Sequence, residues 1–401
     1  MEFLRSLRLD GLLSFAPGSA GIPLTPLNVL IGPNGSGKSN LVEAIELLHA
    51  TPTAFAAAIR DGGGAGEWLW KGPDSTQKIA TIEAVTRAAP LNGTSQYVPE
   101  LRYRLSFTAV AQRTELTDEV IERTDAKAGQ KDVFFYYRFQ NGKPAINVRQ
   151  KKGDAFGTER HLERQSLTPD ESVLSQRKDP DLYPELTWLG QQFGRIHTFR
   201  EWSFGRYGSL RQPQPADLPT DALLPDSRNL GLVLNRLEHS DAGPELNRLL
   251  SKFLPRFKRF STQVGGGTVQ FYLHEDGLRA PIPATRLSDG TMRFIALLAV
   301  LLHPAPPPLI CIEEPELGLH PDAVKLLADL MVEASTRTQL IVSTHSDALV
   351  SAFTEQTESV LVCENMQGTV FRRLEAEKLR HWLDKYRLGE IWRIGELGGN
   401  P

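Results

Sequence analysis

The residues between positions 32 and 40 carry the clearest chemistry in this sequence of 401 residues. Gly32 to Ser39 read G-P-N-G-S-G-K-S, which matches the phosphate-binding pattern G-x-x-x-x-G-K-S. Glycines let the backbone curl until N–H groups point inward at a phosphate, and a following helix N-terminus adds partial positive charge. Lys38 can reach the β- and γ-phosphates of a nucleotide, and the Ser39 hydroxyl can bind Mg²⁺. The candidate nucleotide-binding residues are Asn34, Gly35, Ser36, Gly37, Lys38, Ser39 and Asn40.

The flanking segments decide between a phosphate-binding loop and a glycine-rich turn before an ordinary helix. Residues 27–31 form an apolar run typical of a buried strand. Leu41, Ala44, Ile45 and Leu48 then recur at helical spacing. A strand, a glycine-rich loop and a helix in this order are the setting that the pattern requires. We therefore favour the phosphate-binding loop.

Two acidic residues follow a second apolar run. Residues 309–312 are Leu-Ile-Cys-Ile, and Glu313 and Glu314 come directly after them. Ligands bind at the carboxyl ends of parallel strands, so this arrangement is typical of a Walker B element. Glu313 is expected to hold the Mg²⁺ shell and Glu314 to polarise the attacking water. Alone, the run would indicate only a strand that ends in an acidic turn, but behind a phosphate-binding loop it predicts a catalytic pair.

Two shorter motifs lie beside expected helices and strands. Residues 287–291, L-S-D-G-T, precede a helix-like run, and Ser288 could simply cap that helix. Residues 343–346, S-T-H-S, follow a buried strand, and a lone histidine such as His345 is more often an ordinary surface or core residue.

The four motifs occur in the order of ABC-type ATPase heads, and the sequence resembles that class. The forms I-G-P-N-G-S-G-K-S-N and E-E-P-E-L-G-L-H-P resemble its RecF/SMC/OLD branch. The closest likeness is to predicted RecF-like bacterial AAA-family ATPases associated with phage defence, over roughly residues 1–85 and 265–401.

The resemblance implies roles for the two shorter motifs. Ser288 and Gly290 would bind the γ-phosphate of a nucleotide held by a second copy, and His345 would sense the γ-phosphate. ATP and Mg²⁺ would then lie between two heads of a homodimer. His320 stands where transporter heads carry the D-loop aspartate and receives no catalytic role, while Lys71 and Gln77 are candidates for the Q-loop.

The order of the expected elements predicts an α/β fold. The sequence indicates an ABC-type P-loop NTPase head, with a mostly parallel core sheet, an antiparallel β lobe and no long coiled coil. Strand-like runs fill residues 79–148, helix-like runs lie within 182–253, and strands and helices alternate in the last third. We expect the head to comprise residues 1–90 and 265–401, with a β-rich and then helical subdomain inserted at 91–264.

Composition narrows the class of protein. The chain is 40% hydrophobic with a net charge of −3, so no global basic surface indicates nucleic acid. Cys311 and Cys363 lie far apart in apolar runs, as buried thiols of a reducing compartment would. No signal peptide is evident, and the longest apolar run is too short to cross a bilayer. A cytoplasmic protein without membrane segments is expected.

Two stretches combine basic and aromatic residues and could bind DNA. One is residues 248–259, and the other is residues 195–211. Such patches can neutralise phosphates, but an amphipathic helix with a solvated basic face is the simpler interpretation of each.

The function expected from these features is Mg²⁺-dependent ATP hydrolysis, ATP and water giving ADP and phosphate, in a dimerising switch. The resemblance places such switches in DNA-linked processes, phage defence or repair, with a separate Toprim-like nuclease or another effector as partner. About 27 residues follow Leu374, too few for a fused nuclease. A nucleotide-gated scaffold with little turnover is the alternative, and a transporter motor subunit is a weaker one.

Overall fold

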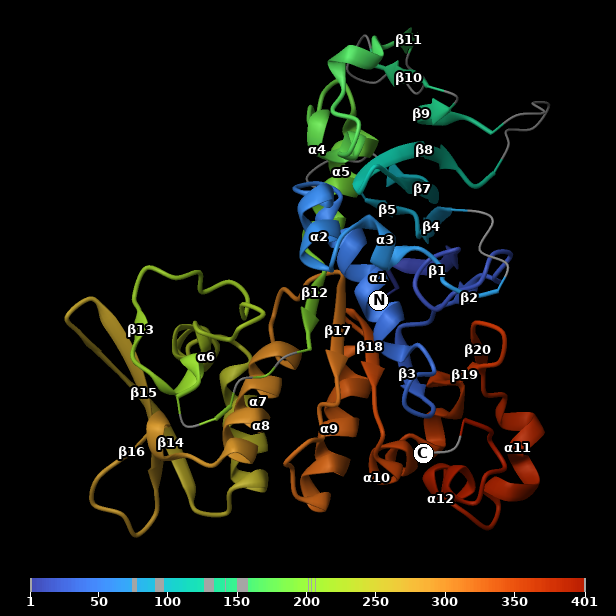
Figure 1. Cartoon of the computed structure of the whole chain (residues 1–401). Coiled ribbons are helices and arrows are strands. Elements are labelled where there is room, and N and C mark those ends of the chain that lie inside the picture. The colour runs from blue at the N-terminus through green and yellow to red at the C-terminus, as the bar shows by residue number, and fades with distance from the viewer. Residues whose placement is uncertain are drawn as a thin grey trace. The chain divides into compact units, whose positions relative to one another are not determined.

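The computed structural model describes residues 2–73, 78–90, 97–125, 133–140, 142–149, 158–200, 202, 204–205 and 207–399 (Figure 1). Gln77, a Q-loop candidate, lies outside these ranges. The chain divides into two compact units. The first contains His197–Val360 and residues 374–399, and the second contains Glu2–Ile196 and Leu361–Arg373. The head and insert boundaries at 90 and 265 stay a prediction, because compactness alone does not separate a head from an insert.

An antiparallel sheet dominates the second unit. Its described strands follow the order β11-β10-β9-β8-β7-β4-β1-β2. Neighbouring strands pair antiparallel, as the strand-like runs of residues 79–148 predicted. The strands are β1 (Leu4–Asp10), β2 (Ile22–Pro23), β4 (Ile79–Thr86), β7 (Leu101–Val110), β8 (Arg113–Arg123), β9 (Phe135–Gln140), β10 (Lys143–Val148) and β11 (Thr158–His161).

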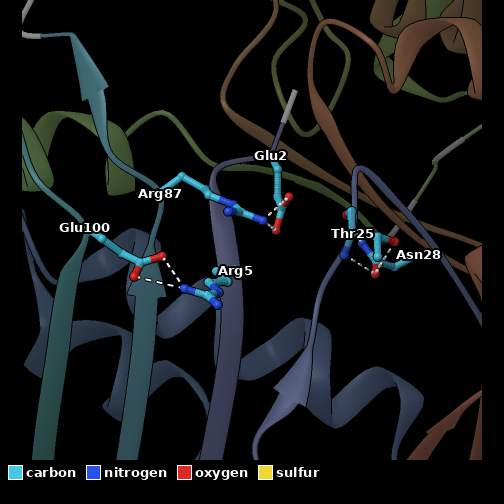
Figure 2. Close-up of polar contacts among 6 residues, drawn as sticks. All are labelled: Glu2, Arg5, Thr25, Asn28, Arg87 and Glu100. Carbon is cyan, nitrogen blue, oxygen red and sulfur yellow. Dashed lines mark hydrogen bonds and ion pairs between the residues drawn. The ribbon is translucent and has the colours of Figure 1, made fainter. Parts of the chain in front are cut away.

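Side-chain alternation explains why these segments form a sheet. In β4 the even-numbered residues from Ala80 to Thr86 are buried and the intervening ones are more exposed, which is the period of a strand. Arg5 of β1 pairs with Glu100 at 2.9 Å, and Arg87 pairs with Glu2 at 2.9 Å (Figure 2). Exposed ion pairs contribute little to stability, so the buried face holds the sheet together.

The strand that leads into the glycine-rich loop also belongs to the second unit. This strand, β3 (Leu27–Ile31), is buried at every residue. Its Asn28 side chain donates to the Thr25 carbonyl at 2.6 Å and accepts from the Thr25 N–H at 3.0 Å (Figure 2). Arg373 donates to the same amide oxygen. These bonds fix the start of the strand. β3 adjoins β19 (Val360–Asn365), which pairs antiparallel with β20 (Thr369–Arg373).

Short helices and strands complete the second unit. The helix after the glycine-rich loop, α1, confirms the expected strand, loop and helix order. The glycine-rich stretch at 61–66 contains the end of one short helix and the start of another. The elements are α1 (Lys38–Ala50), α2 (Phe55–Asp61), α3 (Ala65–Trp68), β5 (Ala89–Pro90), β6 (Tyr97–Val98), α4 (Val173–Gln176) and α5 (Pro184–Phe193).

The first unit contains parallel strands and the helices packed around them. β12 (His197–Phe199), β17 (Leu309–Glu313) and β18 (Gln339–Ser343) pair parallel in that order. Parallel neighbours bring the carboxyl ends of β17 and β18 to one edge of the sheet. The helices are α8 (Asp289–Leu301), α9 (Pro321–Ala334), α10 (Asp347–Ala352), α11 (Ala376–Leu383) and α12 (Leu388–Arg393).

A small sheet and two helices form the rest of the first unit. The sheet contains β13 (Gln214–Pro215), β14 (Phe257–Gly265), β15 (Thr268–Glu275) and β16 (Ile282–Pro283), and α6 (Leu230–Glu238) and α7 (Gly243–Phe253) accompany it. The interpretation of residues 248–259 as one amphipathic helix is wrong. The helix ends at Phe253 because Pro255 disfavours helical backbone at Leu254, which is extended at φ −120° and ψ 98°.

Helix length bears on two expectations. Within the part of the chain that the structure describes, no helix is long and apolar enough to cross a membrane. The longest described helix, α9, has 14 residues, so these ranges contain no long coiled coil.

Candidate functional site

The glycine-rich loop connects β3 to α1 through three glycines with positive φ. Gly32, Gly35 and Gly37 have φ values of 147°, 75° and 109°, which L-residues with side chains rarely adopt. A Cβ at Gly37 would lie 2.1 Å from the Thr369 hydroxyl, so this position also needs glycine for space. The loop therefore curls as a phosphate-binding loop must, and it ends at the N-terminus of α1.

Lysine and serine side chains complete this loop. Lys38 is 6% exposed, and its ammonium donates to the carbonyls of Gly32 at 2.6 Å and Pro33 at 3.0 Å. The Ser36 hydroxyl is buried and has no hydrogen-bond partner among the described residues. Ser39 is exposed at the start of α1. An unpaired hydroxyl and an ammonium held over the loop suit a phosphate, which accepts hydrogen bonds from both.

A hydrogen-bonded row of side chains supports the loop from behind. Asn40 donates to the Ser14 hydroxyl at 2.7 Å, which lies 2.6 Å from the Thr369 hydroxyl. Thr369 donates to the Ser36 carbonyl at 2.8 Å, and the Cys363 thiol donates to the same oxygen at 3.2 Å. Burial raises the pKa of Cys363 to about 11, which keeps the thiol protonated. Sequence reasoning missed Ser14, Thr369 and Cys363, because no motif includes them.

The acidic loop follows β17 and contains a strained residue. Glu314 has φ +47°, an uncommon conformation for a residue other than glycine and one that costs about 1–3 kcal/mol. Its N–H donates to the Ser343 carbonyl at 2.9 Å. Its carboxylate lies 3.9 Å from Nε2 of His345. The structure thus brings together two of the predicted catalytic residues, from the ends of neighbouring parallel strands.

The other acid of the pair has one occupied oxygen and one unpaired oxygen. Arg200 donates to Glu313 Oε2 at 3.1 Å, whereas Glu313 Oε1 is buried and has no hydrogen-bond partner among the described residues. Magnesium prefers oxygen ligands and binds through one or two carboxylates. The residues present fit this metal, because an unpaired buried carboxylate oxygen is a ready ligand.

Two arginines that the motifs do not include hold the segments next to these acids. Arg293 of α8 donates to the Glu314 carbonyl at 2.8 Å and lies over the Phe204 ring at 4.9 Å. Burial lowers the Arg293 pKa. Arg211 is 3% exposed and donates to the Phe204 carbonyl at 2.8 Å. No pattern in the sequence shows which carbonyl a guanidinium reaches, so both arginines were missed in this role.

The L-S-D-G-T motif begins α8. The Ser288 hydroxyl accepts the Thr291 N–H at 3.1 Å, so the capping interpretation is correct, yet the residue remains exposed. Arg211 donates to the Leu287 carbonyl and pairs with Asp289, so its buried guanidinium stabilises the motif. A guanidinium that is buried in these contacts cannot also bind DNA.

Gly290 and His320 complete the motif residues of the first unit. A Cβ at Gly290 would lie 2.4 Å from the Gly318 carbonyl, so the position admits only glycine. His320 accepts the Asp322 N–H at 3.4 Å and caps α9.

The basic residues of the run 248–259 are partly neutralised. Arg248 pairs with Glu245, Arg256 lies 3.7 Å from Glu275, and Lys258 lies 3.7 Å from Asp276. Arg256 and Lys258 keep more than half of their side-chain surface exposed. The run is therefore a mixed-charge surface on the end of a helix and the edge of a hairpin.

Two solved heads of Smc proteins are similar to this fold. One is the Smc head bound to the C-terminal winged-helix domain of ScpA, with 14% identity, coverage of 94% of this chain and 99% of that chain, and a TM-score of 0.56. Another is the Smc head with an extended coiled coil, bound to the C-terminal domain of ScpA from Pyrococcus furiosus, with 15% identity, coverage of 96% and 99%, and a TM-score of 0.57. At these identities the likeness concerns the fold.

The fold and the motifs together define an ABC-type P-loop ATPase head of the RecF/SMC/OLD branch. Residues 27–351 match the family described as "AAA domain, putative AbiEii toxin, Type IV TA system", and the chain belongs to this family. It is also 39% identical over 72 residues to Old nuclease of Escherichia phage P2. That match spans 18% of this chain and 12% of Old nuclease.

Proposed function

We propose that this chain binds ATP with Mg²⁺, hydrolyses it to ADP and phosphate, and uses the cycle to pair and release two copies of itself. The observation that carries the proposal is the arrangement of Glu314. The residue is held with φ +47° at the end of a buried parallel strand, with His345 3.9 Å away. Strained backbone at the end of such a strand is typical of a functional site.

Each residue has a distinct task in this proposal. The loop N–H groups, the Ser36 hydroxyl and the Lys38 ammonium bind the phosphates. The Ser36 hydroxyl has no hydrogen-bond partner among the described residues, and the Lys38 ammonium is held at the loop by the Gly32 carbonyl. Ser39 and Glu313 hold the magnesium ion, which supplies neutralising charge at the phosphates. Glu314 orients the attacking water and takes up its proton, and His345 hydrogen-bonds to the γ-phosphate. That these groups serve one nucleotide is supported by the motif order and the family.

Pairing of two copies is proposed from the L-S-D-G-T motif. Ser288 is exposed at the N-terminus of α8, and Gly290 keeps the following turn close to Gly318. A helix N-terminus with an exposed hydroxyl suits the phosphate of a nucleotide that another copy holds. Binding across two heads would stabilise the pair by mass action. A scaffold that pairs with ATP but turns it over slowly is the alternative.

We propose that this cycle acts in phage defence or another DNA-linked process. The short match to Old nuclease and the family support it. In this proposal a separately encoded nuclease or effector, of the Toprim kind, reads the nucleotide state of the pair. The exposed side chains of Arg256 and Lys258 are candidates for contact with DNA.

Mixing two inactive variants tests the composite site. Lys38→Ala removes the charge on the β- and γ-phosphates, and Ser288→Asp keeps a capping side chain but places a negative charge against the partner's γ-phosphate. Neither variant alone should hydrolyse ATP. In an equimolar mixture half of the pairs are mixed and hold one intact site of two, so about a quarter of wild-type turnover should return.

The control is each variant alone, at the total protein concentration of the mixture. A mixture as inactive as its components would contradict the composite site. A Ser288→Asp variant with full activity alone would remove Ser288 from the mechanism.

A further inference from the structure

A third acid, Glu316, lies two residues after Glu314 and is not explained by the roles above. Its Oε1 accepts the Thr344 hydroxyl at 2.5 Å. Its Oε2 is buried and has no hydrogen-bond partner among the described residues. Burial raises its pKa, while the Thr344 hydroxyl and the backbone N–H of His345 favour its charged form. A buried carboxylate with an unpaired oxygen is costly to keep, so its position calls for a reason.

The Thr344 side chain is held from two sides. Its hydroxyl donates to Glu316 and accepts the Ser346 N–H at 2.9 Å. Thr344 is fully buried, so no water competes for these bonds. The Thr344 hydroxyl is thereby fixed, and its contact with Glu316 joins the loop after β17 to the loop after β18.

This contact is one of two ties that flank the pair Glu314 and His345. The other tie is the Glu314 N–H to the Ser343 carbonyl at 2.9 Å. Along one loop the tied residues are Glu314 and Glu316, and along the other they are Ser343 and Thr344. His345 comes directly after the second tie, so its distance from Glu314 depends on both.

We infer that Glu316 and Thr344 form a positioning pair that sets His345 against the catalytic Glu314. The inference rests on the proposed function of Glu314. Neither residue touches the nucleotide in this account. Their effect passes through the two loop ends, so their loss should lower turnover and leave nucleotide binding by the P-loop in place.

Three substitutions and a control test the pair. Thr344→Val keeps the shape but removes the hydroxyl, Thr344→Ser restores it, and Glu316→Gln keeps an acceptor without the charge. Thr336→Val is the control, because the Thr336 hydroxyl is exposed and donates to the nearby Glu333 carbonyl, away from both loops. A misplacement near 1 Å can cost about a hundredfold in rate, so Thr344→Val should lose roughly ten- to a hundredfold in kcat.

The pattern across the set distinguishes positioning from general destabilisation. ATP affinity of Thr344→Val should stay within about twofold of wild type, and Thr344→Ser should recover most of the lost kcat. The kcat of Glu316→Gln should lie between those of Thr344→Val and Thr344→Ser. In the double variant, Glu316→Gln should lower the kcat of Thr344→Val little further, because the contact is already lost. Wild-type kcat in Thr344→Val, or additive losses in the double variant, would overturn the inference.

A second measurement does not depend on turnover. Amide hydrogen exchange without nucleotide should quicken at Glu314 and Ser346 in Thr344→Val, with α9 unchanged. If wild-type protein hydrolyses no ATP but these amides respond, the proposed function fails and the positioning pair stands. If wild-type protein hydrolyses ATP through Glu314 but these amides and kcat do not respond, the positioning pair alone fails.

Discussion

Glu119 of β8 should make the stability of the second unit depend on pH. Its carboxyl group is buried and accepts the Ser172 hydroxyl at 2.5 Å, the Val173 N–H at 2.9 Å and the Tyr103 hydroxyl at 2.9 Å. Burial, the largest cause, raises its pKa from 4.5 to about 7. The carboxyl group therefore binds a proton more tightly in the folded state than in the unfolded state.

The sign of the effect follows from this proton affinity. The folded state holds more protons than the unfolded state between pH 4.5 and about 7, so stability falls as the pH rises through that window. Each pKa unit corresponds to 1.36 kcal/mol, so the loss from this group is about 3 kcal/mol. The contribution is fully present below pH 4.5 and is gone above about pH 7.

Glu119→Gln isolates this contribution. The amide is neutral at every pH, its oxygen can accept the Val173 N–H, and the two hydroxyls can rotate to accept from its NH₂ group. Urea unfolding of both proteins at pH 5, 6, 7 and 8 should show the variant gaining roughly 2–3 kcal/mol on wild type across the series.

Glu122→Gln, on the same strand but more exposed, serves as the control for the loss of one carboxylate. Parallel curves for wild type and Glu119→Gln would refute the reasoning, because they would show that Glu119 has the same pKa folded and unfolded.

Two further predictions concern the phosphate loop and the basic surface. Thr369→Val removes the hydroxyl behind Ser36 and should weaken ATP binding about fivefold, the scale of one hydrogen bond, measured by calorimetry against Thr336→Val; unchanged affinity would show that the row of side chains is not needed. Charge reversal at Lys252, Arg256 and Lys258 should flatten the salt dependence of DNA binding by about one unit of slope per lost phosphate contact, and an unchanged slope would return this surface to a merely solvated one.

The sequence predicted the elements that have a continuous apolar run or a regular apolar spacing. β3, α1, β17 and β18 lie where the apolar runs indicated, and β4, β7, β8, β9 and β10 belong to the expected antiparallel sheet. The strand β14 was missed because basic and aromatic residues from 248 to 259 continue the appearance of a helix across Pro255. The helices α2 and α3 were not predicted, because each has too few residues to show a clear hydrophobic period.

The candidate site was predictable in its motifs and not in its supports. Lys38, Ser288, Glu314 and His345 belong to recognisable patterns, and in the structure the Glu314 carboxylate lies 3.9 Å from the His345 ring nitrogen. The positive φ of Glu314 could not be predicted, because residues other than glycine rarely adopt it.

The supporting contacts come from distant parts of the chain. Four contacts act through atoms that only the folded chain brings within hydrogen-bond distance: Arg293 to Glu314, Arg211 to Leu287, Thr369 to Ser36 and Thr344 to Glu316. Sequence spacing carries no record of such contacts, because each joins segments that are separated by many residues.

ATP turnover by Glu314→Gln tests whether the Glu314 carboxylate activates the attacking water. The amide keeps the size of the side chain but cannot take up a proton from water, so turnover should fall by at least roughly a hundredfold. ATP and Mg²⁺ should still bind, because Lys38, Ser39 and Glu313 are unchanged, and light scattering should show an ATP-dependent shift to a larger species. Hydrolysis at the wild-type rate would contradict the account and place the catalytic carboxylate elsewhere.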